Sequence, residues 1–126
     1  MPKYFAAEAG WCIDSGMIGF DEMQVNWEAL EDTTVMLFDV KDMKELIYGD
    51  EHLKNIWISV LESGLRYKVY RENGFLVENA TERYVEFRKR YPALSKRVPQ
   101  RYIATYLGIK PESLSRIRSS MKEDKK

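Results

Sequence analysis

The sequence contains few of the residues from which catalytic and metal sites are most often built. Its 126 residues include one cysteine, Cys12, and one histidine, His52. A disulfide within the chain and a zinc site of cysteine ligands are excluded, and a histidine-based metal site or catalytic triad is not expected. Acidic residues such as Glu8 and Asp14 have no partner at a spacing that suits a nucleophile and its base. We therefore expect a protein that is not an enzyme and that uses no metal or cofactor.

Long hydrophobic runs are also absent from the sequence. No stretch reaches the roughly 18 apolar residues that a membrane-spanning helix requires. Residues 1–20 contain Glu8 and Asp14 and lack the apolar stretch of a secretory signal peptide. The composition, which is 44% hydrophobic and 32% charged, is sufficient for a folded core. We expect a cytoplasmic protein without a membrane partner.

Charge is divided unevenly along a chain whose net charge is zero. Residues 1–80 contain 7 Lys and Arg against 15 Asp and Glu, a net charge of −8, whereas residues 81–126 contain 13 against 5, a net charge of +8. Such asymmetry is typical of an acidic body joined to a basic nucleic-acid-binding end. A solvated tail is the alternative, but most of these basic residues are interleaved with a regular apolar pattern. The sequence therefore predicts a nucleic-acid-binding C-terminal part.

The first third of the sequence has the pattern of short strands and turns. Residues 24–29 alternate between apolar and polar side chains, and the segment TVMLF at 34–38 has the composition of a short buried strand. Asp39 is in position to cap a short helix over residues 40–48. Residues 1–50 are therefore predicted to form part of an antiparallel β-sheet within an α+β fold.

A long amphipathic helix is predicted from about Glu51 to Asn73. Apolar or small residues recur on one face at spacings of three and four, which is typical of a helix that packs against another helix. Packing on the chain's own sheet is the alternative to pairing with a second copy, which we favour because the preceding sheet is small. The predicted dimer interface consists of Leu53, Trp57, Val60, Gly64 and Tyr67.

A hinge is predicted after this helix, because Asn73-Gly74 should end or kink it. A new helix should begin at Asn79, with Glu82 three residues later completing a capping box. This helix is expected to end before Pro92. The chain is thus predicted to divide into residues 1–50, 51–78 and 79–126.

Residues 100–118 match the pattern of a helix-turn-helix. Gly108 lies where the sharp turn needs a residue with positive φ, and Ala104 lies where the helices cross and only a small side chain fits. Pro111 is in the first turn of the second helix, where its missing N–H is harmless. Five apolar residues complete the predicted interhelical core: Ile103, Leu107, Ile109, Leu114 and Ile117.

The residues that this core leaves outside are short, polar and basic, whereas a solvated helix would usually alternate Glu and Lys. Arg116 can form a bidentate hydrogen bond with guanine, and Glu112 can accept one from cytosine. Arg101, Ser113, Lys96 and Arg97 are in positions to meet phosphates. The predicted DNA-binding residues are Arg101, Lys110, Pro111, Glu112, Ser113, Ser115, Arg116 and Ser119.

The segment ERYVEFRKRYPALSKRVPQRYIATYLGIKPESLSRIRSSM, residues 82–121, resembles the C-terminal DNA-binding segment of Crp/Fnr-type transcription regulators. The segments ALEDTTVMLFD and EHLKNIWISVLESGLRYKVY are similar to the last strands of that family's β-roll and to its dimerisation helix. The resemblance implies a homodimeric regulator that binds double-stranded DNA, with RNA polymerase as a further partner. It also implies that Glu112 and Arg116 are the recognition-helix residues.

The sequence departs from this family at three places. The family's β-roll has more strands before the segment KYF, so the resemblance implies an N-terminally shortened member. Met23-Gln24 stands where an Arg-Ser pair holds the phosphate of a cyclic nucleotide, so no response to cyclic nucleotides is expected. No strand pattern for a wing hairpin follows the recognition helix. A chain with half a sensor would alternatively be a protein-interaction module that pairs with a full-length regulator.

Overall fold

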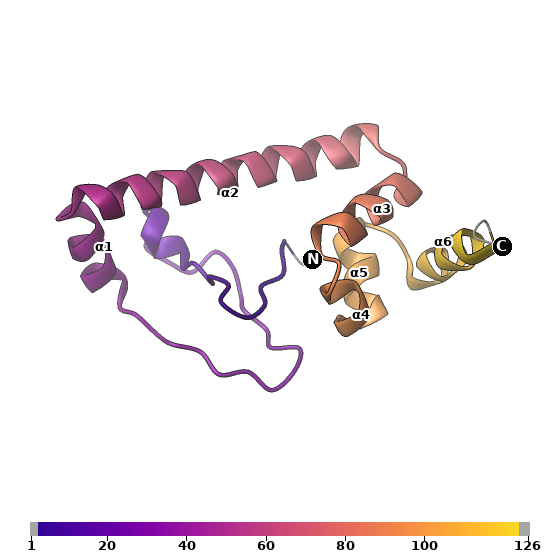
Figure 1. Ribbon diagram of the computed structural model, residues 1–126, viewed down its shortest axis with the longest axis horizontal. Coiled ribbons are helices and arrows are strands. Elements are labelled where there is room, and N and C mark those ends of the chain that lie inside the picture. Colours follow the sequence, from indigo (N-terminus) through magenta and orange to yellow (C-terminus); the bar gives the residue numbers. More distant parts are fainter. Residues whose placement is uncertain (1–2, 124–126) are drawn as a thin grey trace. The chain divides into compact units, whose positions relative to one another are not determined.

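The computed structural model describes residues 3–123, in which all regular secondary structure is helical (Figure 1). These residues form a 3-10 helix, η1 (Ser15–Ile18), and the helices α1 (Val40–Tyr48), α2 (Glu51–Val77), α3 (Ala80–Arg90), α4 (Leu94–Arg97), α5 (Gln100–Leu107) and α6 (Pro111–Glu123). The described chain divides into two compact units, one of residues 8–68 and one of residues 3–7 with residues 69–123. The division falls within α2, so both units include part of this helix.

The predicted α+β fold, with a partial β-roll in residues 1–50, is wrong. No β-strand occurs in residues 3–123, and the segment expected to be a buried strand has no regular secondary structure. Its side chains are exposed, with Val35 at 64%, Met36 at 80% and Leu37 at 89%. A strand is stable only when a neighbouring strand pairs with its backbone N–H and C=O groups. The apolar pattern indicates a local preference for the extended backbone of a strand. This preference does not produce a strand where no neighbouring strand pairs with it.

The first turns of α1 and α3 are set by capping side chains. The Asp39 carboxylate accepts hydrogen bonds from the backbone N–H groups of Lys41 and Asp42, at 2.9 and 3.2 Å. The Asn79 side chain accepts from the N–H of Glu82, and the Glu82 carboxylate accepts from the N–H of Asn79, both at 2.9 Å. These bonds satisfy donors that a helix leaves free in its first turn. Both predicted caps are confirmed.

Helix α2 is longer than the sequence predicted. It continues through Asn73-Gly74 to Val77, so the prediction that it ends at this pair is wrong. Glycine within a helix costs about 1 kcal/mol relative to alanine. Contacts of the last turns offset this cost, because Arg71 donates a hydrogen bond to the backbone oxygen of Tyr106 at 2.8 Å. Neither α2 nor any other helix within residues 3–123 has the length and apolar content needed to cross a membrane.

An aromatic cluster joins the N-terminal segment to α3 and α5. Phe87 of α3 is only 1% exposed. Its ring centroid lies 6.0 Å from that of Phe5 and 5.4 Å from those of Tyr91 and Tyr106. Rings at these distances add attraction between their edges and faces to the effect of burial. The cluster therefore forms the centre of the unit that carries the helix-turn-helix.

The unit of residues 8–68 buries few of its side chains. Ser15 is buried, accepts a hydrogen bond from the backbone N–H of Gln24 at 2.9 Å and donates one to the backbone oxygen of Glu22 at 3.4 Å. Ile47 of α1 is the one buried hydrophobic residue within residues 8–68. Many other large apolar side chains of this unit are exposed: Trp11, Ile18, Phe20, Met23, Val35, Met36, Leu37 and Phe38. This unit therefore presents apolar surface that its own core does not cover.

Candidate nucleic-acid interface

The turn between α5 and α6 has the backbone conformation that a helix-turn-helix needs. Gly108 has a φ of 71°, in the left-handed region that favours glycine. The N–H of Gly108 donates to the backbone oxygen of Thr105 at 3.1 Å, and the N–H of Ile109 donates to that of Ala104 at 3.0 Å. These two bonds satisfy carbonyls at the end of α5. Pro111 is the first residue of α6, as predicted.

The predicted interhelical core lies between these two helices. Ile103, Ala104, Leu107 and Leu114 are at most 1% exposed, so a larger side chain at Ala104 would have no space. Ile109 and Ile117 are half-buried at the margin of the core. The sequence therefore predicted which residues face inward, and this fixes which face of α6 is turned outward.

Two arginines anchor the end of α5 against the neighbouring helices. Arg71 of α2 donates to the backbone oxygen of Tyr106 at 2.8 Å, and its guanidinium carbon lies 3.5 Å from the centroid of the Tyr106 ring. Arg83 of α3 donates to the backbone oxygens of Leu107 and Glu78, at 3.1 and 2.6 Å. The acceptors at Tyr106 and Leu107 belong to the last turn of α5, where carbonyls lack helical partners. Sequence reasoning missed both residues, and only the arginine content of α2 and α3 hinted at them.

The predicted DNA-binding residues lie on α6 and near it, with their side chains largely free. Lys110, Pro111, Glu112, Ser115, Arg116, Ser119 and Arg101 are exposed, and Ser113 is half-buried. An Nη of Arg116 lies 3.4 Å from the Ser113 hydroxyl, a long hydrogen bond within one helical turn. Arg101 on α5 donates to the Tyr102 hydroxyl at 3.3 Å. The structure thus brings Arg116 and Ser113 together and leaves Arg101 on the neighbouring helix.

The cations of this face are not neutralised by carboxylates. Salt bridges within residues 3–123 join Lys54 to Glu51, Arg66 to Glu62 and Lys89 to Glu86, and none is found there for Arg101, Lys110 or Arg116. The guanidinium donors of Arg116 are largely unused, because the hydrogen bond to Ser113 is long and exposed to solvent. An arginine in this state presents a planar set of donors to an approaching acceptor. Chemically, the face suits an anion or the acceptor edge of a base.

Three cations beside this face are not among the predicted DNA-binding residues. Arg88 lies in the last turn of α3, and Arg118 and Lys122 are one turn apart on α6. Arg118 is half-buried, whereas the other two are exposed. Arg118 and Lys122 form an i, i+4 pair, which can be seen in the sequence. Their proximity to Arg88 results from the packing of α3 and α6, which the sequence pattern does not show.

The predicted dimer residues lie on one face of α2. Within the single chain Leu53, Trp57, Val60 and Tyr67 are half-buried, and Gly64 is exposed. A Cβ added at Gly64 would meet no atom within 4 Å, so there is open space beside this residue. A second apolar stripe on α2 is more exposed and consists of Ile58, Leu61, Leu65 and Val69.

Comparison with known protein families, with curated proteins and with solved structures found no match to this chain.

Proposed function

We propose that this protein is a sequence-specific DNA-binding transcription regulator of the cytoplasm that acts as a homodimer. The observation that carries the proposal is the outer face of α6, where Glu112 and Arg116 are exposed above a buried helix-turn-helix core and no salt bridge within residues 3–123 engages Arg116. The resemblance of residues 82–121 to Crp/Fnr-type regulators supports the same function. The proposal includes no catalysis, no cofactor and no response to cyclic nucleotides.

Sequence would be read by direct contacts in the major groove. Arg116 offers two parallel N–H donors that match the O6 and N7 acceptors of guanine, and Glu112, four residues earlier on the same face, accepts from the N4 amino group of cytosine. Arg101 and Ser113 would bind phosphates, which orients the helix without distinguishing bases. The short side chains of Ser115 and Ser119 allow α6 to approach the groove closely.

Replacing Arg116, the proposed base contact, and replacing Arg101, the proposed phosphate contact, should change DNA binding in different ways. Arg116→Ala should cost about 1–3 kcal/mol of binding free energy and remove the preference at one base position. Arg101→Ala should weaken binding to all sequences about equally and reduce the slope of log affinity against log salt by about one unit. Binding-site selection with the wild type and both variants, followed by affinity measurements over a salt series, separates the two effects.

Arg66→Ala is the matched control for this experiment, because Arg66 is an exposed arginine of α2 paired only with Glu62 at 3.9 Å. It should change neither the selected sequence nor the salt slope. If Arg116→Ala selects the same sequence as the wild type, α6 does not read the bases and the proposed function is wrong.

The dimer is expected to form through the predicted face of α2. Val60→Glu should give a monomer, because a buried carboxylate without a partner is strongly unfavourable at an interface between two helices. Leu65→Glu is the matched control, because Leu65 belongs to the second stripe and is 64% exposed. Light scattering coupled to size-exclusion chromatography gives the mass of each variant, and circular dichroism verifies that each is folded.

Two results would contradict this arrangement. A wild-type protein that is monomeric at high micromolar concentration has no such dimer. If Leu65→Glu dissociates while Val60→Glu remains dimeric, the interface is formed by the stripe of Ile58, Leu61, Leu65 and Val69. In the expected dimer, the selected sites contain two half-sites about 34 Å apart.

A protein-interaction module that pairs with a full-length regulator is the second candidate. It is favoured by the exposed apolar side chains of residues 8–68, because contiguous apolar surface commonly marks a protein contact. This candidate requires no DNA contact by α6. An affinity for DNA that is lost in Arg116→Ala argues against it, whereas a chain that binds no DNA at low salt but joins a second regulator favours it.

A further inference from the structure

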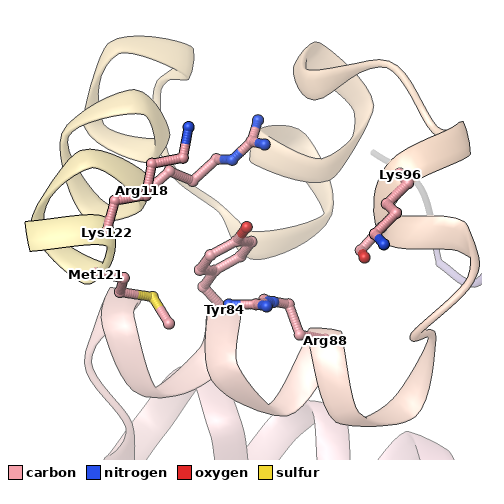
Figure 2. Close-up of a pocket in the computed structure, with 7 residues that line it drawn as sticks. Tyr84, Arg88, Lys96, Arg118, Met121 and Lys122 are labelled. Atoms are coloured by element: carbon pink, nitrogen blue, oxygen red, sulfur yellow. The ribbon is translucent and has the colours of Figure 1, made fainter. Parts of the chain in front are cut away.

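A pocket lined by positive charges lies between α3, α4 and α6, beside the face proposed to read DNA (Figure 2). We call it the basic pocket and define it by Tyr84 and Arg88 of α3, Lys96 of α4, and Arg118 and Lys122 of α6. Its volume is about 210 Å³. Ser95 and Met121 complete the lining, so the pocket contains four cationic side chains and no carboxylate. Three separate helices contribute these charges.

The four cations of the basic pocket have no counter-ion within residues 3–123. None of the salt bridges there involves Arg88, Lys96, Arg118 or Lys122. Like charges gathered around one cavity repel one another, and a bound anion would remove that repulsion. Arg118 is half-buried, so its charge is less well solvated than that of a fully exposed arginine. The electrostatics of the pocket therefore favour an anionic ligand.

The hydroxyl group of Tyr84 adds a neutral hydrogen-bond donor to the pocket. Tyr84 is 6% exposed, and its ring is packed with the guanidinium carbon of Arg88 5.9 Å from the ring centroid. The hydroxyl points into the pocket, toward the side chain of Arg118 (Figure 2). A hydroxyl that points into the pocket can donate a hydrogen bond to a ligand with acceptor oxygens.

We propose that the basic pocket binds a phosphate group. A phosphate carries several acceptor oxygens, which the donors of Arg88, Arg118 and Lys122 and the hydroxyl of Tyr84 can share. A ligand with fewer acceptors would bind fewer of these donors. The pocket volume accommodates one phosphate with part of an attached group.

The favoured source of this phosphate is the backbone of bound DNA, and in this respect the inference rests on the proposed function. Ser115 lies on the outer face of α6, and Arg118 and Lys122 follow it by three and seven residues. Residues at these spacings share one flank of a helix. DNA whose groove receives the outer face of α6 would thus bring a backbone phosphate to that flank. Free inorganic phosphate, or a small molecule that carries phosphate, is the other source.

The DNA arm of the test uses the full chain and three variants. Arg118→Gln and Lys122→Gln should each lower the salt slope by about one unit and leave the selected sequence unchanged, as expected for phosphate contacts. Tyr84→Phe keeps the ring and removes only the hydroxyl, and it should weaken DNA binding about tenfold, the effect of one hydrogen bond to a charged group. Arg66→Gln is the matched control and should change neither the salt slope nor the affinity for DNA.

The second arm uses inorganic phosphate in the absence of DNA, with sodium chloride at equal ionic strength as the comparison. NMR signals of the Tyr84 ring and the Met121 methyl group should shift with phosphate and saturate. Arg118→Gln and Lys122→Gln should abolish the saturable shift, and their circular dichroism should match that of the wild type. Lys122 is exposed, so this variant remains informative if Arg118→Gln folds poorly.

The two arms separate the pocket from the proposed function. Pocket-dependent effects on DNA support a backbone phosphate, and saturable shifts without any DNA binding support a phosphate site in a protein that does not bind DNA. If the variants bind DNA with the wild-type salt slope and phosphate causes no more change than chloride, the basic pocket does not bind phosphate.

Discussion

Phe87→Ala should destabilise the unit that carries the helix-turn-helix by about 3–5 kcal/mol, the range for removing a fully buried aromatic ring. Phe87 is 1% exposed and its ring meets those of Phe5, Tyr91 and Tyr106. Alanine would leave a cavity bounded by these three rings, and it would remove three aromatic pairs as well as buried area. An effect of this size is comparable with the whole stability of a small domain.

Hydrogen exchange is the suitable measurement for this variant, because it reports each unit separately. The amides of Ile103 and Leu107 in α5 should lose protection in Phe87→Ala. Phe38→Ala is the matched control, because Phe38 is 56% exposed and its truncation should change stability by no more than about 0.5 kcal/mol. If protection in α5 is equal in the two variants, the aromatic cluster does not stabilise this unit.

The parts of the fold that could be predicted from the sequence depend on contacts between residues near in sequence. The cap at Asp39 and the capping box at Asn79 join residues at most three positions apart. The helix-turn-helix pattern is also local, because the turn at Gly108 and the core around Ala104 lie within one short segment. For such features the residue types themselves determine the local backbone conformation.

The absence of a sheet from residues 3–123 could not be predicted, because strand pairing depends on residues distant in sequence. Residues 34–38 have apolar, β-branched and aromatic side chains, and these favour a strand wherever a partner strand exists. Nothing within residues 3–123 supplies that partner. The continuation of α2 past Gly74 has a similar explanation, since the bond from Arg71 to Tyr106 spans 35 positions. Local propensity is a weak guide where distant contacts decide.

The candidate site was predictable in its outline but not in the roles of individual arginines. Periodicity alone placed Arg116 on the outer face of α6, because the buried residues fix the opposite face. No pattern distinguished it from Arg71 and Arg83, whose donors bind backbone oxygens of α5. Nor did any pattern bring Arg88 beside Arg118. The roles of these residues follow from helix packing, which sequence periodicity does not describe.

Gly108→Ala should be the second most damaging of the changes considered, with a loss of about 2–5 kcal/mol from two separate causes. The φ of 71° is unfavourable for any residue with a Cβ, at about 1–2 kcal/mol. The added Cβ would also lie 2.9 Å from Cε1 of Phe75, a distance that forces the ring or the turn to move. Because Phe75 packs under the guanidinium carbons of Arg71 and Arg83, at 4.8 and 5.3 Å, moving the ring disturbs both anchors of α5.

A double-mutant cycle with Phe75→Ala separates these two causes. In the Phe75→Ala background the steric conflict is absent, so Gly108→Ala should cost only the backbone part, about 1–2 kcal/mol. Urea denaturation of the wild type, both single variants and the double variant gives the coupling energy. DNA affinity should decrease in Gly108→Ala more than stability alone explains at temperatures where the variant is folded, because the turn sets the direction in which α6 leaves α5. A coupling energy of zero, with DNA affinity unchanged, would mean that the turn accommodates the methyl group and that the geometry at Gly108 does not control the position of α6.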